Sequence, residues 1–307
     1  MKKTIIIGTR GSKLALWQTN WVKQQIQQGF PELKVEIVTI KTTGDMITDR
    51  PLAAVGGKGL FVKEIEKALL ESSIDIAVHS MKDMPGDLPD GLEIGAIPER
   101  ENPFDVLISK DNLRLDQLPK GARVGTSSLR RASQIKHARP DIETASIRGN
   151  LDTRLKKLAA GEFDATLLAA AGLHRLGMKE KISQYLDEDI MLPAVGQGAL
   201  CIESREGDGE LAPILAFLNH PETNTVVTAE RAFLKRLEGS CHIPVACFGR
   251  LENDQVVLTG VVASENGETV IKEVVTGNAA NVKQTGIDLA ETLLSRGADK
   301  ILENLNS

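Results

Sequence analysis

Aromatic residues are scarce in this chain: tryptophan, tyrosine and phenylalanine together make up 3% of its 307 residues. Proteins that bind single-stranded nucleic acid stack the bases on aromatic side chains, so this composition argues against that class. The formal net charge of -5 points the same way, because general nucleic-acid binders are basic. We therefore expect no nucleic-acid partner.

Cysteine and long apolar runs are scarce too. Cys201, Cys241 and Cys247 form no CxxC pair and no metal-ligand spacing with histidine, so neither a disulfide framework nor a zinc site is predicted. Near the N-terminus only Ile5–Ile7 are consecutive large apolar residues, too few for a signal peptide, and no run approaches a membrane span. We expect a cytoplasmic protein with reduced thiols and no membrane partner.

The chain is long, and hydrophobic residues make up 41% of it, so two or three domains with their own cores are expected. Apolar strand-like runs alternate with helical patterns through the first two thirds, which predicts α/β units with mostly parallel sheets. The last third indicates an α+β module, with a boundary near 217–222. Its final helix should be ended by Gly297. Strands are expected at 4–8, 35–40, 74–78, 106–109, 123–125, 144–147, 164–168, 199–203, 245–251, 256–263 and 269–275, and helices at 12–28, 60–71, 128–138, 151–160, 223–237 and 281–295.

The stretch from Thr42 to Lys58 fits neither pattern and is rich in glycine towards its end. Loops of this length inside compact domains are usually functional lids or disordered. We interpret it as a mobile lid over a site, with Lys58 able to reach an anion.

Three expected strand–turn–helix junctions carry arginine and hydroxyl side chains: 10–12, 125–131 and 146–154. A helix start offers free N–H groups, and arginine adds a fork that fits a carboxylate. One such turn is weak evidence, but in open α/β sheets ligands bind at this edge. Residues 120–157 also hold ten Lys or Arg against three acids, a net +7. The pattern indicates an anionic ligand, whereas the missing Walker A and GxGxxG spacings disfavour a nucleotide.

A Lys82–Asp83 pair follows the strand expected at 74–78. The pair could simply be solvated surface charge. Alternatively, the Asp83 carboxylate could move a proton or stabilise a cation while the Lys82 ammonium holds a substrate anion. His79, at the end of the same strand, could orient neighbouring groups, although a single histidine there is more often structural.

Cys241 lies in a Gly-Ser-Cys-His loop between an amphipathic helix and a strand, where a covalent group could be attached. Free cysteines are most often buried and structural, and Cys201 and Cys247 fit that description better. Arg231, Lys235 and Arg236 on the preceding helix would favour a thiolate at Cys241. Spacing alone leaves both interpretations of Cys241 open.

Taken together, these segments resemble the porphobilinogen deaminase family over essentially the whole chain. Several long motifs in the same order make the resemblance specific. They are GTRGSKLALWQ at 8–18, VGGKGLF at 55–61, AVHSMKD at 77–83, VGTSSLRR at 124–131, LPAVGQG at 192–198 and LEGSC at 237–241.

The resemblance implies an α/β fold with two periplasmic-binding-protein-like α/β domains and a smaller α+β C-terminal domain. Domain 1 would comprise 1–98 and 194–218, domain 2 99–193, and domain 3 219–307. It also implies a transferase with a dipyrromethane cofactor in thioether linkage to Cys241. Four porphobilinogen molecules would be joined head to tail with loss of ammonia, and water would release hydroxymethylbilane for tetrapyrrole and haem synthesis.

The resemblance further assigns residues to roles. Asp83 and Lys82 match the catalytic positions. Besides Cys241, the matches to cofactor-binding positions are Lys82, Asp83, Thr126, Ser128, Arg130, Arg131, Arg148 and Gln197. The matches to positions that bind porphobilinogen or the growing oligopyrrole chain are Arg10, Ser12, Lys58, Phe61, Ser80, Arg148, Arg154 and Arg175.

Each porphobilinogen carries two carboxylates, which explains many arginines in an acidic protein. The resemblance implies that the product passes to uroporphyrinogen-III synthase, and we expect a monomer without a metal. The alternative is a non-catalytic two-domain binding protein for a small anion. That alternative explains the arginine turns and the lid, but not the third domain or the Cys241 loop.

Overall fold

The computed structural model describes residues 2–46, 59–237 and 243–305. The chain divides into two compact units, one formed by Met1–Glu101 and Ala199–Asn224 and the other by Asn102–Gly198 and Thr225–Ser307. Within the described residues, the first unit contains one β-sheet and the second contains two.

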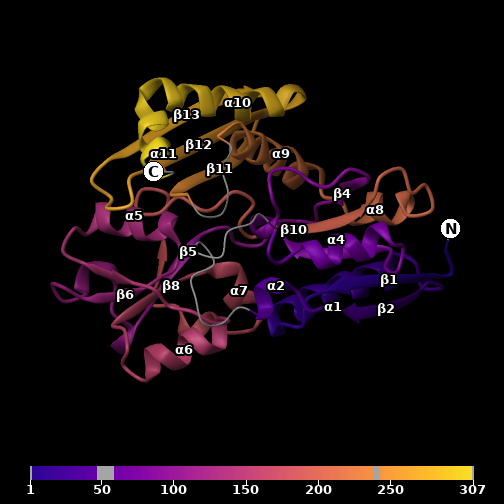
Figure 1. Cartoon of the computed structure of the whole chain (residues 1–307), viewed down its shortest axis with the longest axis horizontal. Helices are drawn as coiled ribbons and strands as arrows, with labels where there is room; N and C mark the ends of the chain where they lie inside the picture. Colours follow the sequence, from indigo (N-terminus) through magenta and orange to yellow (C-terminus); the bar gives the residue numbers. More distant parts are fainter. Residues whose placement is uncertain (1, 47–58, 238–242, 306–307) are drawn as a thin grey trace. The chain divides into compact units, whose positions relative to one another are not determined.

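The first unit is built on a five-stranded sheet (Figure 1). The strand order is β2 (Lys34–Thr39), β1 (Thr4–Thr9), β3 (Ile76–Ser80), β10 (Leu200–Arg205) and β4 (Leu92–Ala96). The first three strands are parallel, and β10 runs antiparallel to both of its neighbours. Apolar residues of α1 (Lys13–Gly29) and α8 (Ala212–Leu218) cover one face of this sheet, and those of α4 (Lys63–Leu70) cover the other.

The second unit repeats this strand pattern. Its five-stranded sheet has the order β7 (Glu143–Ala145), β6 (Arg123–Gly125), β8 (Ala165–Ala169), β5 (Asp105–Ser109) and β9 (Gln184–Leu186). The first three strands are again parallel, and the fourth, β5, is antiparallel to both neighbours. The connecting helices are α5 (Leu129–Ala138), α6 (Leu151–Ala159) and α7 (Ala170–Arg175).

The second unit also contains a three-stranded antiparallel sheet. Its elements are α9 (Pro221–Arg236), β11 (Val245–Glu252), β12 (Gln255–Ala263), β13 (Val270–Asn278), α10 (Val282–Leu293) and α11 (Asp299–Leu305). One face packs against α9 and α10 in a large apolar cluster. On the other face, Ala246 and Phe248 pack with Leu192 and Phe104, which joins this sheet to the rest of the unit.

The predicted fold class, α/β followed by a smaller α+β region, is confirmed. The helix expected at 281–295 is interrupted at Gly297, as predicted, because the φ of Gly297 is 101° and is not helical. It is not the final helix, since the chain continues after this kink as α11. Glycine adopts such a left-handed backbone conformation without strain. Strand β3 spans Ile76–Ser80 where 74–78 was expected, so it ends two residues later and includes His79 and Ser80.

The sequence did not predict β4, β9, α7, α8 or α11. Within the stretch interpreted as a lid, Thr43–Met46 form the short helix α2, and residues 47–58 lie outside the described part of the chain. Over the described ranges, no helix combines the length and the apolar character that crossing a bilayer requires.

Candidate functional site

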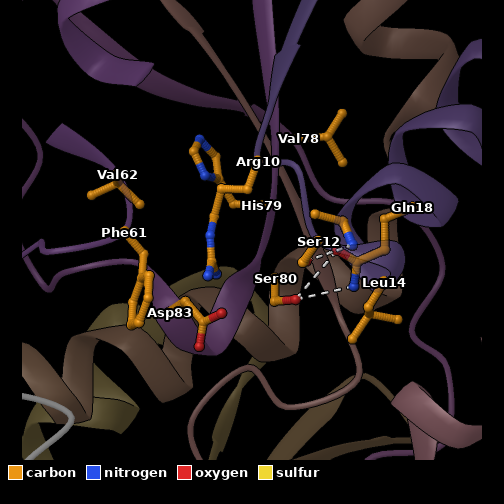
Figure 2. Close-up of a pocket in the computed structure, with 11 residues that line it drawn as sticks. Arg10, Ser12, Leu14, Gln18, Phe61, Val62, Val78, His79, Ser80 and Asp83 are labelled. Atoms are coloured by element: carbon orange, nitrogen blue, oxygen red, sulfur yellow. Dashed lines mark hydrogen bonds between the residues drawn. The ribbon is translucent and has the colours of Figure 1, made fainter. Parts of the chain in front are cut away.

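A pocket in the first unit brings together side chains from the turn after β1, from α1, from the residues just before α4, and from the end of β3 with the turn that follows it (Figure 2). Five residues predicted from the sequence line it: Arg10, Ser12, Phe61, Ser80 and Asp83. Figure 2 shows Arg10 and Asp83 pointing into the same space, with Phe61 on one side and Ser80 on the other. The pocket therefore combines a cation, a carboxylate, two hydroxyls and an aromatic ring.

The turn between β1 and α1 positions Arg10 and Ser12. Ser12 is the N-cap of α1, and its hydroxyl accepts a hydrogen bond from the backbone N–H of Ala15 at 3.2 Å. This cap fixes the start of the helix, as its sequence position predicted. The chain direction at the turn then places Arg10 at the carboxyl end of β1, the edge where open sheets bind ligands.

Arg10 has a carboxylate partner in the described structure. Its Nε donates to Oδ1 of Asp45 at 3.1 Å, its Nη2 also bonds to Asp45, and its guanidinium carbon lies 4.1 Å from the centre of the Phe61 ring. Burial would raise the pKa of Asp45, but hydrogen bonds from Arg10 and Thr42 outweigh this and hold that pKa below its usual value. The Arg10 guanidinium is therefore already oriented to bind a carboxylate through two of its nitrogens.

Asp83 is placed by a short 3₁₀ helix, η1 (Met81–Asp83), which directly follows β3. Met81 and Met84 are each 1% exposed, so they anchor the turn in the core and leave Lys82 and Asp83 half-buried at the surface. Ser80, the last residue of β3, accepts a hydrogen bond at 3.0 Å from the side chain of Gln18 on α1. Gln18 is almost fully buried, and this contact ties the two halves of the pocket wall together.

In the second unit, the residues predicted to bind the cofactor cluster around a buried carboxylate, Asp105. Arg130 donates to Oδ2 of Asp105 at 2.7 Å and to the carbonyl oxygen of Leu192 at 2.7 Å. Arg131 donates through Nε to Oδ1 of Asp105 at 2.8 Å. The Asp105 side chain is 0% exposed. Two guanidinium groups thus share one carboxylate, and the group of three carries an excess positive charge.

Arg154 adds to this positive charge. Burial, together with the neighbouring charges of Arg131 and Arg148, lowers the pKa of Arg154 to about 10. The turn that carries these residues depends on Gly149, whose φ is 107° and whose carbonyl accepts a hydrogen bond from Arg154 at 3.0 Å. A Cβ at Gly149 would lie 2.5 Å from a Thr153 methyl group, so this turn requires glycine.

Backbone geometry ties the turns after β6 and β7 together. The backbone N–H of Thr126 donates to the carbonyl of Ala145 at 2.9 Å, and the hydroxyl of Ser127 donates to that of Ile147 at 2.8 Å. Thr126 is buried and accepts a hydrogen bond at 3.2 Å from the N–H of Ser128, the N-cap of α5. Two of the three predicted arginine turns are therefore adjacent in the second unit.

The segment 192–198 is held within the second unit by buried side chains. Gln197 donates to the carbonyl of Pro103 at 2.6 Å, and Arg175 donates to that of Gly198 at 2.7 Å. Glu230 on α9 accepts from the N–H of Gly196 at 2.7 Å and from that of Gly249 at 2.9 Å. Glu230 therefore fixes the segment that carries Gln197 to the first strand of the three-stranded sheet.

The predicted residues thus form two groups. One lines the pocket of the first unit and the other surrounds Asp105 and segment 192–198 in the second unit. Lys82 lies beside Asp83 but does not line the pocket. Lys58 and Cys241, the predicted lid lysine and cofactor anchor, lie outside the described residues. Among the residues that are described, no group of three histidine, cysteine or acidic side chains is placed to hold a metal ion.

Sequence reasoning missed Asp45, Asp105 and Gln18. Asp105 had a usable signal, because an acid at the start of the apolar run Val106–Ile108 must be paired if it is buried. Gln18 carried no signal, because one amide on a helix has many possible partners. Asp45 lies in the stretch that fitted neither strand nor helix.

Comparison with known proteins covers nearly the whole chain. Residues 5–213 match the model for the porphobilinogen deaminase dipyromethane cofactor binding domain, and residues 224–295 match the porphobilinogen deaminase C-terminal domain. A porphobilinogen deaminase of Geotalea uraniireducens is 53% identical over 300 residues, which cover 98% of this chain and 94% of the relative. That of Alkaliphilus metalliredigens is 52% identical over 305 residues, covering 99% and 96%.

Among solved structures, a probable amino-acid ABC transporter extracellular-binding protein from Bacillus subtilis is similar over 70% of this chain and 90% of its own. The two are 13% identical with a TM-score of 0.43, and so distant a likeness says nothing about activity. The curated relatives are much closer and cover both ends of the chain, and the two family models account for most of its length. This chain therefore belongs to the porphobilinogen deaminase family.

Proposed function

We propose that this chain condenses four porphobilinogen molecules head to tail, releasing ammonia at each step, and then hydrolyses the product to hydroxymethylbilane. The observation that carries this proposal is the pocket of the first unit, where Asp83, Arg10 and two hydroxyls converge in a member of the porphobilinogen deaminase family. The names of the relatives give no support to the non-catalytic anion-binding alternative.

The arginine cluster of the second unit fits a dipyrromethane cofactor. A dipyrromethane made from two porphobilinogen units carries four carboxylates, and the cluster holds more cations than its buried Asp105 balances. Arg131, Arg148 and Arg154 would contact those carboxylates, and Cys241 would hold the group covalently. When bound, the cofactor would supply the free pyrrole carbon to which the first substrate unit is joined.

Asp105 gives the arginines of this cluster a fixed geometry before any ligand arrives. Arg130 and Arg131 each donate hydrogen bonds to Asp105 and to a backbone carbonyl oxygen. Their side chains therefore cannot rotate freely. Preorganised cations bind an anion without the cost of ordering long side chains at that moment. Thr126, Ser128 and Gln197 would add neutral hydrogen-bonding partners.

In the pocket, Arg10, Ser12 and Ser80 would hold the carboxylates of the incoming porphobilinogen against the Phe61 wall. The Asp83 carboxylate would stabilise the cation left on that pyrrole when ammonia departs and would carry a proton, a general acid–base role worth roughly 10²–10⁴-fold in rate. Lys82, in the same turn, would hold a further carboxylate. Lys58, Arg148, Arg154 and Arg175 would bind the lengthening chain.

Finer aspects of the function rest on family membership and on the sequence. We place the activity in the transferase class and expect a cytoplasmic monomer whose product passes to uroporphyrinogen-III synthase. We also propose three domains: 1–98 with 194–218, 99–193 and 219–307. In that division Asp83 belongs to domain 1, most of the arginines to domain 2, and Cys241 to domain 3.

The deciding experiment measures the intact mass of the purified protein and of Cys241→Ser, each before and after incubation with porphobilinogen. We expect an added mass of two linked pyrrole units in the parent and none in the variant. Cys247→Ser, which alters a buried strand cysteine, is the matched control and should load normally. A parent that stays at its bare polypeptide mass and makes no hydroxymethylbilane would refute the proposed function.

A further inference from the structure

Behind the pocket wall lies a buried group of ionisable side chains that the roles above do not use. His79 lines the pocket, its side chain is 3% exposed, and its Nε2 lies 3.0 Å from Oε2 of Glu203. Glu203 is 0% exposed, and its other oxygen, Oε1, has no hydrogen-bond partner among the described residues. Burying a carboxylate when only one of its two oxygens has a hydrogen-bond partner costs folding free energy. The presence of Glu203 at this position therefore needs a physical explanation.

Strand register explains how these groups meet. Strands β3 and β10 are antiparallel, with Ala77 opposite Glu203 and His79 opposite Cys201. All four side chains therefore project to the same face of the sheet, because side chains alternate along a strand. Helix α4 packs against both strands on that face.

Helix α4 contributes a second carboxylate, Glu66. Its side chain is buried, and its Oε1 also lacks a hydrogen-bond partner among the described residues. Burial raises the pKa of Glu66 to about 7, and the negative charge of Glu203 adds to the effect, while His79 and Lys63 oppose it. The remaining charged neighbour, Glu64, is held by the backbone and hydroxyl of Thr43 and raises the pKa slightly further.

We propose that Glu66, Glu203 and His79 form a proton relay behind the Asp83 pocket, with His79 as its contact to the pocket and Glu66 as the group that holds the proton until it passes to ammonia. In this chain Glu203 is a positioning residue that orients the His79 ring. The proposal rests on the proposed function, because it assigns this group a part in the same condensation.

The condensation releases one proton that needs an acceptor. The carbon–nitrogen bond of the porphobilinogen aminomethyl group breaks, and its electron pair leaves with ammonia. A carbon–carbon bond then forms at the free carbon of the receiving pyrrole, and the hydrogen on that carbon leaves as a proton. Asp83 carries this proton first, and the relay then takes it up and passes it to ammonia, which departs as ammonium. Asp83 and the relay both return to their starting charge.

The relay can accept a proton only while Glu66 is ionised. We therefore expect kcat of the parent to rise with pH through about 7, the value at which Glu66 loses its proton. In Glu66→Gln this rise should disappear, and kcat at pH 8 should fall about tenfold, a modest share of what a general base contributes. KM should stay unchanged, because Glu66 is not among the residues that line the pocket.

A structural role for Glu66 would give a different pattern, so stability is measured as well. In the folded protein the pKa of Glu66 lies above its unfolded value, so this group destabilises the fold increasingly as pH rises from about 4.5 to about 7. Glu66→Gln removes that cost and should unfold at a higher denaturant concentration than the parent at pH 8. A variant that is slower yet more stable supports the relay.

Glu71→Gln, an exposed acid directly after α4, is the matched control and should leave both kcat and its pH profile unchanged. A second variant, Glu203→Gln, should lower kcat while retaining cofactor loading by intact mass. The relay is overturned if Glu66→Gln keeps the parent's pH profile while making product normally, and the proposed function then still stands.

A readout independent of turnover is the carboxyl carbon resonance of Glu66, assigned by comparing labelled parent with Glu66→Gln. Titration near pH 7 supports the relay, and titration near the ordinary glutamate value overturns it. This measurement also decides the question for a parent that makes no product, an outcome that would refute the proposed function by itself.

Discussion

Both units of this protein hold arginines against a carboxylate, but they do so in different surroundings. In the pocket of the first unit, the side chains of Arg10 and Asp45 are 23% and 28% exposed. In the second unit, the side chains of Arg130 and Arg131 are 6% and 8% exposed, and that of Asp105 is 0% exposed. Arg10 can exchange its carboxylate partner in water, whereas the Asp105 carboxylate is closed off from solvent.

This difference in burial separates a replaceable partner from a permanent one. Partly exposed ion pairs contribute about 0–1 kcal/mol, so a ligand carboxylate can displace Asp45 from Arg10 at little cost. Removing one partner of a buried pair leaves an uncompensated charge and costs about 3–5 kcal/mol. We infer that Asp45 occupies the position on Arg10 that a substrate carboxylate takes when it binds. Asp105, in contrast, is a permanent partner that holds Arg130 and Arg131 in position.

The largest expected effect on activity separates chemistry from charge balance in the pocket. Asp83→Asn keeps the size of the side chain but removes its charge and its ability to carry a proton. We expect turnover to fall by roughly 10²–10⁴-fold while the protein remains folded and loaded with cofactor. Single-turnover assays with porphobilinogen, combined with intact mass, measure both. Near-normal turnover would remove Asp83 from the mechanism.

The largest effect on stability should come from removing the charge of the buried Asp105 carboxylate. In Asp105→Asn the neutral amide cannot balance Arg130 and Arg131, and we expect the free energy of unfolding to fall by about 3–5 kcal/mol. Urea denaturation measures it. Asp141→Asn is the control, because Asp141 pairs with Arg139 at a partly exposed position, where we expect a much smaller loss. An equal loss in the free energy of unfolding for the two variants would contradict the distinction between buried and partly exposed ion pairs.

Arg148 tests the outer part of the same arginine cluster. It is only half-buried, so Arg148→Ala should change the free energy of unfolding by less than about 1 kcal/mol. Cofactor loading or the first elongation steps should slow about tenfold, the equivalent of one charge-assisted hydrogen bond. The pKa of Arg154 should move back towards its ordinary value, because Arg148 lowers it. An unchanged elongation profile, followed by mass spectrometry of the intermediates, would argue against this role.

The sequence predicted most elements because their signals were local. Ser12 was expected to cap α1 and does so, and strand β1 followed from the run Ile5–Ile7. The predicted pocket residues came from motifs that lie at strand ends, and the sheet order brings those ends to one edge. Gly297 correctly marked the point where the helix is interrupted, but a single glycine does not show that a further helix, α11, follows it.

The missed features depend on contacts between distant residues. Glu203 meets His79 across 124 positions of the chain, and Arg130 meets Asp105 across 25. In each contact one partner stands on the antiparallel strand of its sheet, Glu203 on β10 and Asp105 on β5. The sequence shows the polar residues of such a strand but not its neighbours. Buried polar pairs are therefore the part of the site that required the structure.

The smallest expected effect tests whether Asp45 really keeps the place of a substrate carboxylate. In Asp45→Asn, Arg10 loses its charged partner, so porphobilinogen no longer has to displace it. We expect KM to fall by about two- to fivefold, the range that a partly exposed ion pair allows, with kcat little changed. Steady-state kinetics measure both. Glu36→Gln, which removes an exposed carboxylate paired with Lys34 on the same sheet, should leave KM unaltered. A rise in KM would instead show that Asp45 orients Arg10 for the substrate, and the pocket pair would then be as much a part of the architecture as the Asp105 group.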